Sequence, residues 1–178
     1  MGVDSMRVLN IDIDGVVADL LTPWLDYYNS RTGESIKKSD ITCWDLEDCL
    51  QHKEVIREFL YLPGVYRNLE VIGNAKKVLK ELNKDFKLQF VTATPHHARD
   101  DRLYWVQKHF PYIKDIYFAE DKSTIKADLL LDDRPKNLIS FPGIKVCFDH
   151  EYNKNVPVAH YRVKDIEEFF RLVYRFWG

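Results

Sequence analysis

The strongest constraint on the fold is a short apolar run that ends in two aspartates. Residues 8–13 read Val-Leu-Asn-Ile-Asp-Ile, and Asp14 and Gly15 follow directly. A run this short and this rich in branched side chains is typical of a strand buried in a parallel sheet. Asp12 and Asp14 alternate with apolar neighbours, so an extended backbone projects both carboxylates to one side. We expect a cation or a proton between them, because adjacent negative charges repel each other.

Gly15 allows the backbone to turn sharply after this strand and leaves room for a ligand. A calcium-binding EF-hand loop is excluded, because its glycine follows a third acidic position whereas Gly15 follows Asp14 directly. A plain acidic turn after a core strand remains an alternative for this motif taken alone. The residues further along the chain decide between the two interpretations.

The composition indicates a globular protein of one domain, with room for an inserted subdomain. The 178 residues are 46% hydrophobic and 30% charged, and the formal net charge is -2. This charge balance does not indicate a general binding surface for polymeric nucleic acid. No apolar run approaches the ~20 residues of a membrane span, and the first residues lack a signal-peptide pattern. We therefore expect a cytoplasmic protein that contacts neither a membrane nor a nucleic-acid polymer.

The cysteines support the same expectation. Cys43, Cys49 and Cys147 have no spacing typical of metal ligands, and their number is odd. We expect three reduced thiols, as in an intracellular protein. Met1 to Ser5, which precede a second methionine, are either an added tail or an alternative start, and we give them no weight.

Apolar periodicity predicts strands that alternate with helices. Further strands are expected at 87–92, 115–119, 128–131, 144–148 and 161–163. Helices are expected at 16–29, within 45–61, at 74–83 and 97–109, from 135 onward, and at 165–176. This alternation predicts an α/β fold, with a Rossmann-like parallel sheet covered by helices in three layers.

Polar side chains gather at the strand ends of this predicted sheet. They are Asp12, Asp14, Thr92, Asp132 and Asp133, with Lys122 in the loop before the fourth strand. Open parallel sheets bind ligands beyond the carboxyl ends of their strands. Carboxylates, a main-chain carbonyl and a substrate phosphate are ligands that Mg²⁺ prefers, and a hydroxyl and an ammonium suit phosphate oxygens. The set predicts Mg²⁺-assisted phosphoryl transfer.

Each of these residues also has a simpler interpretation when taken alone. Thr92 can be a loop hydroxyl, and Lys122 a solvated surface lysine. Asp132 and Asp133 can cap the helix that follows them. Arg134 is expected to form a salt bridge that braces the loop carrying Asp132 and Asp133, rather than to contact substrate. In combination with the first motif, however, the functional interpretation is favoured.

Four motifs, in this order, resemble those of the haloacid dehalogenase-like (HAD-like) phosphatases. They are Asp12-Ile13-Asp14-Gly15-Val16, Val91-Thr92, Lys122 and Leu131-Asp132-Asp133. Other stretches are similar to the 5'(3')-deoxyribonucleotidases, namely Pro63-Gly64-Val65-Tyr66, Trp105-Val106, Asp121-Lys122-Ser123 and residues 127–135. The resemblance covers about residues 9–137. The related enzymes generally read Thr-Ser-Pro at the second motif, whereas residues 92–95 read Thr-Ala-Thr-Pro, which removes a phosphate-contacting hydroxyl.

The resemblance implies a HAD-like catalytic core at residues 1–16 and 70–178, with a helical cap at residues 17–69. It implies that Asp12 is the nucleophile and forms an aspartyl-phosphate, and that Asp14 is the general acid and base. The other implied roles are phosphate binding by Thr92, Lys122 and Arg102, Mg²⁺ binding by Asp12, Asp14 and Asp132, and support of the metal shell by Asp133.

Three of these assignments keep an alternative. Arg102 can equally be a surface charge. Trp44 and Tyr66 resemble the base-binding aromatics of the nucleotidases, but aromatic side chains can equally fill a small cap core. The cap residues therefore carry the question of substrate.

The predicted function is Mg²⁺-dependent hydrolysis of a small phosphate monoester, foremost a deoxynucleoside monophosphate. A sugar phosphate or another small phosphometabolite is the first alternative. A phosphorylated signalling receiver is disfavoured, because its phosphate-accepting Asp stands on a middle strand. A non-catalytic Mg²⁺-binding relative stays open, and dehalogenation ranks lower because it does not need Asp14 or the metal ligands. A homodimer is left open as the assembly.

Overall fold

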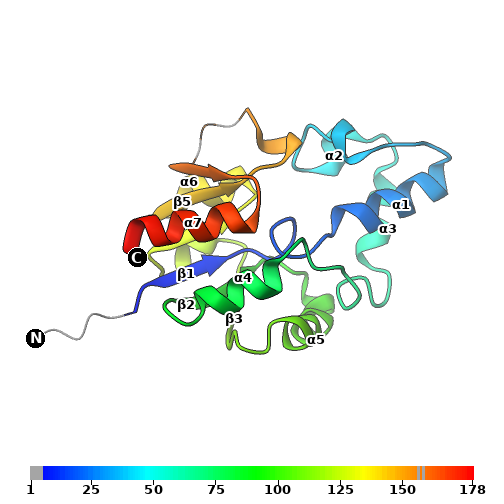
Figure 1. Ribbon diagram of the computed structural model, residues 1–178. Coiled ribbons are helices and arrows are strands. Elements are labelled where there is room, and N and C mark those ends of the chain that lie inside the picture. The colour runs from blue at the N-terminus through cyan, green and yellow to red at the C-terminus, as the bar shows by residue number, and fades with distance from the viewer. Residues whose placement is uncertain (1–5, 156, 158) are drawn as a thin grey trace, which may run out of the picture.

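The computed structural model describes residues 6–155, 157 and 159–178 of the chain (Figure 1). Met1 to Ser5 lie outside the described residues. One parallel sheet has the strand order β3-β2-β1-β4-β5-β6. Its strands are β1 (Val8–Ile11), β2 (Lys87–Thr92), β3 (Asp115–Phe118), β4 (Leu129–Asp132), β5 (Ile144–Phe148) and β6 (Tyr161–Val163). The predicted α/β class and parallel sheet are confirmed.

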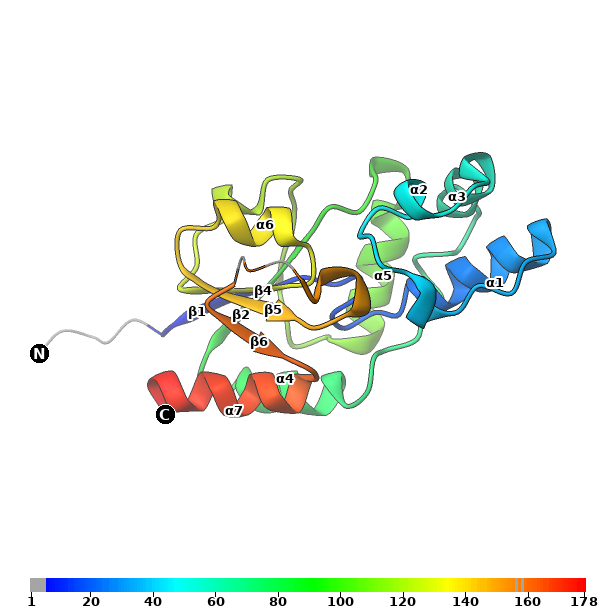
Figure 2. The same cartoon turned by 90° about the horizontal axis from the view of Figure 1, so that it is seen from above.

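Helices cover both faces of the sheet. They are α4 (Ala75–Leu82), α5 (Arg99–His109), α6 (Pro135–Ser140) and α7 (Ile166–Trp177), with α1 (Leu21–Thr32), α2 (Leu46–Cys49) and α3 (Lys53–Leu60) beyond its end. Helices α4 and α7 lie side by side on one face, and α6 lies on the other (Figure 2). Short 3₁₀ turns are η1 (Lys38–Asp40), η2 (His96–Ala98), η3 (Lys122–Thr124) and η4 (Glu151–Asn153).

The first helix begins later than the sequence predicted. Residues 16–18 do not start a helix but turn back on the residues that follow β1, because the amides of Val17 and Ala18 both donate to the Ile13 carbonyl at 2.9 Å. Their side chains are fully buried in the main core. An apolar run at helical spacing therefore belongs in part to a buried turn, which periodicity alone does not distinguish.

Strand residues alternate between two apolar layers. Leu129 and Leu131 pack into the main core with residues of α4, α5 and α7, whereas Leu130 packs with Leu138 and Phe141 of the α6 side. Successive side chains of a strand point to opposite faces, so this alternation follows from the pleat. The burial of both faces explains why β1 and β4 are nearly continuous apolar runs.

Two buried polar side chains interrupt this pattern on the α6 side. Asn10 of β1 and Gln89 of β2 lie side by side in the sheet register, and Gln89 Nε2 donates to Asn10 Oδ1 at 3.1 Å. Asn10 Nδ2 donates to the Ile125 carbonyl at 2.8 Å, and Gln89 Nε2 also reaches the Lys126 carbonyl at 3.2 Å. The pair therefore holds the loop that follows η3 against the sheet, and Lys122 lies in η3 directly before this loop.

We expect Asn10→Ala to lower the free energy of unfolding by about 1–3 kcal/mol, because it leaves buried polar partners unsatisfied. Urea unfolding followed by tryptophan fluorescence measures the change. The exposed Gln107 of α5 is the control for an amide side chain, and Gln107→Ala should change stability by less than about 0.5 kcal/mol. Equal losses in the two variants would contradict the role given to Asn10.

Helices α1, α2 and α3 form a separate layer beyond the carboxyl ends of the strands (Figure 1). They have their own apolar cluster of Leu25, Tyr28, Ile41, Leu46, Leu50, Val55 and Ile56. Two paired linkers join this cap to the core: the Asp19 amide donates to the Glu70 carbonyl, and the Ile72 amide to the Val17 carbonyl, both at 2.9 Å. The division at residues 16/17 and 69/70 stays a proposal.

The prediction of three reduced thiols is wrong for two of them. Cys43 and Cys49 form a disulfide, and Cys147 is a free, buried cysteine. The single turn of α2 brings the two Cα atoms to 6.2 Å, within the range that a disulfide bridges. The spacing in the sequence does not reveal this turn. Within the described residues, the structure has no helix that is both long enough and apolar enough to span a membrane.

Candidate active site

The predicted site residues meet at the carboxyl end of the sheet. Asp12 follows β1, Thr92 ends β2, Asp132 ends β4 and Lys122 begins η3. With the exception of Asp132, these residues line a cavity of about 350 Å³ between the sheet and the cap. Loops at strand ends thus bring together residues that are more than a hundred positions apart, as expected for a parallel sheet.

Lys122 is the electrostatic centre of the cluster. Its side chain is 1% exposed, and Nζ lies 2.5 Å from Asp12 Oδ1 and 2.6 Å from Asp132 Oδ2. The interpretation of Lys122 as a solvated surface lysine is therefore wrong. Burial by itself lowers the pKa of Lys122, but the two carboxylates raise it by more than burial lowers it. The pKa of Lys122 is therefore raised, and the ammonium stays charged.

Both partner carboxylates have raised pKa values. Burial raises the pKa of Asp132 to about 6, although the charge of Lys122 acts in the opposite direction. Burial also raises the pKa of Asp12, again against the effect of Lys122. Desolvation disfavours a charged carboxylate, and one ammonium does not fully compensate two buried carboxylates. The site therefore has a deficit of positive charge.

Asp132 has a structural task as well. Its Oδ1 accepts the Arg134 amide at 2.8 Å, and Asn137 Nδ2 donates to Oδ1 and Oδ2 at 3.1 and 3.0 Å. These bonds tie the start of α6 to the end of β4. Arg134, whose amide Asp132 accepts, is itself the N-cap residue of α6, and the helix has no side-chain cap hydrogen bond, so the capping interpretation of Asp132 is wrong.

A third carboxylate completes a group that fits a metal ion. Oxygens of Asp12, Asp132 and Asp133 lie within 4.8 Å of one another, and all three residues are buried. Burial and the two neighbouring aspartates raise the pKa of Asp133 well above its usual range. Three hard oxygen donors and one lysine leave an uncompensated negative charge, which a divalent cation would balance. The side chain of Asp14 lies outside this group.

Gly15 is required where the backbone passes this group. Its φ is +78°, a region that favours glycine. A Cβ at this position would lie 2.5 Å from Asp133 Oδ2 and 3.1 Å from the Tyr152 hydroxyl. The glycine therefore serves both the turn and the close approach of Asp133.

The segment after β5 contributes residues that the sequence did not single out. The Tyr152 hydroxyl donates to Asp133 Oδ2, and Asn153 Nδ2 donates to the Asp133 carbonyl at 2.8 Å. His150 Nε2 lies 2.6 Å from the Gly15 carbonyl, and its ring stacks on Tyr152 with centroids 4.8 Å apart. The position of this segment at a strand end was the only clue, since it carries no motif.

Arg102 lies behind Asp14 and does not line the cavity. It is fully buried on α5, so its interpretation as a surface charge is wrong. Nη2 lies 2.5 Å from Asp14 Oδ1, and Nε donates to Thr94 Oγ1 at 3.1 Å. Thr94 Oγ1 is in turn 2.9 Å from Thr92 Oγ1. A buried chain of contacts thus links the first and second motifs, and the hydroxyl that follows Ala93 belongs to it.

The two aromatics of the cap line the cavity in different ways. Tyr66 is 4% exposed, and the Arg102 guanidinium lies 5.0 Å from its ring centroid. Trp44 is 40% exposed, and the Arg134 guanidinium lies 3.7 Å from its ring centroid. Among the described residues Arg134 forms no ion pair, so the prediction that it forms a salt bridge is wrong. Instead, it joins the loop after β4 to the cap by a cation–π contact.

The comparisons with known proteins identify the family of the chain. A family model described as "5' nucleotidase, deoxy (Pyrimidine), cytosolic type C protein" matches residues 6–176. The chain belongs to this family. A 5'(3')-deoxyribonucleotidase of Bacillus subtilis is 36% identical over 154 residues, which cover 84% of the chain and 88% of that relative. One of Clostridium acetobutylicum is 34% identical over 151 residues, which cover 83% and 84%. The predicted family and the prediction of a phosphatase-type enzyme are confirmed.

Solved structures of the same fold are more distant in sequence. A haloacid dehalogenase-like hydrolase from Streptococcus pneumoniae has a TM-score of 0.67 and 12% identity, covering 96% of the chain and 98% of that structure. A HAD-type hydrolase from Bacillus subtilis, solved bound to magnesium, has a TM-score of 0.60 and 15% identity, covering 95% and 99%. The HAD-like fold is confirmed.

We expect Arg102→Met and Asp14→Asn to be strongly coupled in stability. Each single variant leaves a charge at this pair without its partner, whereas the double variant removes both charges. The free energies of unfolding of the four proteins should give a coupling energy of about 1–3 kcal/mol.

Arg67 and Asp101 are the matched control, since they form the same type of pair at 2.8 Å with side chains 44% and 28% exposed. Their coupling should stay below about 1 kcal/mol because solvent screens it. Additive losses for Arg102 and Asp14 would show that the buried pair does not hold Asp14 in place.

Proposed function

We propose that this chain is a Mg²⁺-dependent phosphomonoesterase that hydrolyses deoxynucleoside monophosphates through an aspartyl-phosphate. The observation that carries the proposal is the buried Lys122 ammonium, which is shared by Asp12 and Asp132 at the floor of the cavity. The names of the relatives from Bacillus subtilis and Clostridium acetobutylicum support the choice of substrate.

Asp12 is the proposed nucleophile. It lines the cavity and is 7% exposed, and Lys122 binds its Oδ1, which leaves the other oxygen for attack. A carboxylate oxygen forms a bond to phosphorus while the ester bond to the leaving oxygen breaks. Water then attacks the phosphorus, which releases inorganic phosphate and restores the Asp12 carboxylate.

Asp14 is the proposed acid and base of these two steps. It lines the cavity beside Asp12 and is held from behind by Arg102. As an acid it gives a proton to the leaving oxygen, and as a base it takes a proton from the attacking water. The ion pair directs one carboxylate oxygen toward Arg102, so the other can serve the reaction.

The fit of the carboxylate group supports Mg²⁺ as the cofactor. Asp12, Asp132 and the Asp14 carbonyl are the proposed ligands, and Asp133, held by Tyr152, is the supporting residue. When bound, Mg²⁺ neutralises part of the charge of the phosphate and the carboxylates. Lys122 and Thr92 are the proposed phosphate-binding residues, because an ammonium and a hydroxyl line the same floor.

The cap supplies a wall suited to a nucleoside. Trp24, Trp44, Ile56 and Tyr66 line the cavity, which is mostly apolar. A volume of about 350 Å³ falls in the range of small-molecule sites. A base can stack on an aromatic face, while the floor holds the phosphate.

We expect phosphate release from deoxynucleoside monophosphates to require both the metal and Asp12. The wild-type protein should be active with Mg²⁺ and lose activity after treatment with EDTA, because uncompensated carboxylates repel an anionic substrate. Asp12→Asn should abolish turnover, since an amide cannot replace the nucleophile. Asp14→Asn should lower kcat roughly 10²–10⁴-fold through the loss of acid–base assistance.

A screen of phosphate release across nucleotides and sugar phosphates provides the measurement, and circular dichroism checks that each variant is folded. Near-normal turnover of folded Asp12→Asn would rule out the covalent route. A preference for sugar phosphates would reject the nucleotide substrate and retain the phosphatase chemistry.

We expect Trp44→Ala and Tyr66→Ala to raise KM for deoxynucleotides much more than for a small artificial phosphate ester. Stacking contributes roughly 1–3 kcal/mol per base, and a small ester lacks the base. Tyr61 is the control, because it is a cap aromatic that is 71% exposed and does not line the cavity. Tyr61→Ala should leave both KM values unchanged. Equal losses on the two substrates would instead indicate a defect in cap folding.

A further inference from the structure

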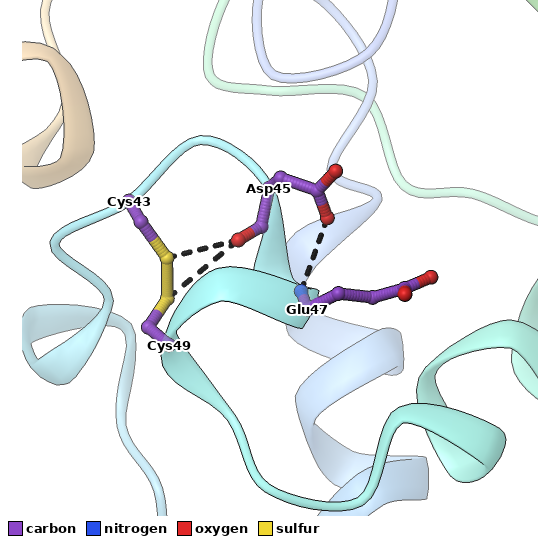
Figure 3. The surroundings of a disulfide bond; sticks show 4 residues. All are labelled: Cys43, Asp45, Glu47 and Cys49. Atoms are coloured by element: carbon purple, nitrogen blue, oxygen red, sulfur yellow. Dashed lines mark hydrogen bonds between the residues drawn. A yellow bond between two sulfur atoms is a disulfide. The ribbon is translucent and has the colours of Figure 1, made fainter.

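The disulfide of the cap encloses part of the cavity wall. Cys43 and Cys49 are six positions apart, and the bond between them closes a short loop, residues 43–49, that contains α2 (Figure 3). Within this loop, residues 44–47 line the cavity. The loop therefore presents Trp44, a proposed base-contacting residue, from within a covalent ring.

Non-covalent contacts also order this loop. α2 has four residues, and a single helical turn is unstable by itself. Asp45 caps it by accepting the Glu47 amide at 3.0 Å, and the Asp45 carbonyl lies 2.9 Å from Cys43 Sγ (Figure 3). Arg57 binds Glu47 at the surface, and Leu46 is buried in the cap cluster. The disulfide is the contact that ties both ends of the loop together.

The disulfide is accessible, and the third cysteine is not. Cys43 and Cys49 are each partly exposed on the cap, whereas Cys147 is fully buried on β5. The full burial of the Cys147 thiol keeps it out of reach of a thiol reagent. Exchange chemistry is therefore directed to the pair in the cap.

We propose that Cys43 and Cys49 form a thiol–disulfide exchange site, and that its redox state sets the affinity of the cavity for the nucleoside part of the substrate. The reductant is a dithiol. One of its thiolates attacks a sulfur of the pair, breaks the S–S bond and forms a mixed disulfide. Its second thiolate resolves that bond, so the dithiol becomes a disulfide and the two cysteines become thiols.

Reduction acts on the cap and spares the catalytic floor. Once the disulfide is reduced, no covalent bond joins Cys43, the neighbour of Trp44, to the end of α2. The Arg134 guanidinium remains the contact of Trp44 with the core. Asp12, Asp132 and Lys122 are held by core elements that the disulfide does not touch. Nucleotide binding should therefore weaken while the chemistry of the phosphate persists. This readout rests on the proposed function, but the exchange itself does not.

The first test measures the exchange without substrate. The native protein is treated with dithiothreitol, freed of it, and unfolded for thiol titration. We expect one thiol per chain before treatment, which is Cys147, and three after it. Hydrogen exchange of the amides of residues 44–48 should become faster on reduction, because the loop opens locally. A disulfide that resists dithiothreitol until the protein is unfolded would overturn the proposal.

The second test measures KM in the two redox states. For thymidine 5'-monophosphate KM should rise roughly 5- to 20-fold on reduction, which is part of the stacking contribution of one base. For a small artificial phosphate ester KM and kcat should change little. Cys43→Ser/Cys49→Ser should match the reduced protein and should not respond to dithiothreitol.

The outcomes separate this proposal from the proposed function. Equal nucleotide KM in both states, with the loop opened, would overturn the control of affinity. Loss of activity on both esters would indicate damage to the cap fold and would also overturn it. If neither state hydrolyses either ester, the proposed function fails. Calorimetric binding of thymidine 5'-monophosphate to the two states then decides whether the disulfide controls affinity.

Discussion

The candidate site depends on one buried ammonium. Lys122 lies between Asp12 and Asp132, which come from neighbouring parallel strands and would otherwise repel each other. Its position depends in turn on the loop after η3, which Asn10 and Gln89 hold against the sheet. Asn10 and Gln89, two polar side chains inside an apolar layer, therefore help to position the charge of Lys122 at the strand ends.

Core and cap are connected through side chains that also belong to the site. Tyr152 binds Asp133 and packs against the apolar cluster of the cap. Arg134 follows Asp133 in the chain and covers Trp44. Contacts of this kind couple the position of the cap to the carboxylate group. Movement of the whole cap, as distinct from local opening of the loop at residues 43–49, would therefore change the position of the residues proposed to carry the chemistry.

Much of this could be predicted from the sequence because strand ends converge in a parallel sheet. This rule predicts that Asp12, Thr92 and Asp132 lie at one edge of the sheet, as the structure shows, whereas Lys122 was predicted only to lie in the loop before the fourth strand. The resemblance singled out Arg102, but neither its burial nor its ion pair with Asp14 was predicted, because a sequence does not reveal which element packs behind a side chain. Tyr152 was missed, since its segment carries no motif and acquires its place only when β5 joins the sheet.

The sequence by itself determined the parallel α/β fold, the family and which acidic and basic residues meet at the candidate site, because these depend on local patterns and on the order of motifs. Only the tertiary structure decided which charges pair. The partnership of Arg102 with Asp14 spans 88 positions, and that of Tyr152 with Asp133 spans 19. The disulfide between Cys43 and Cys49 depends on the helical turn of α2, which brings the two residues close together. Such contacts arise from the packing of elements against one another, and no local preference of the chain encodes them.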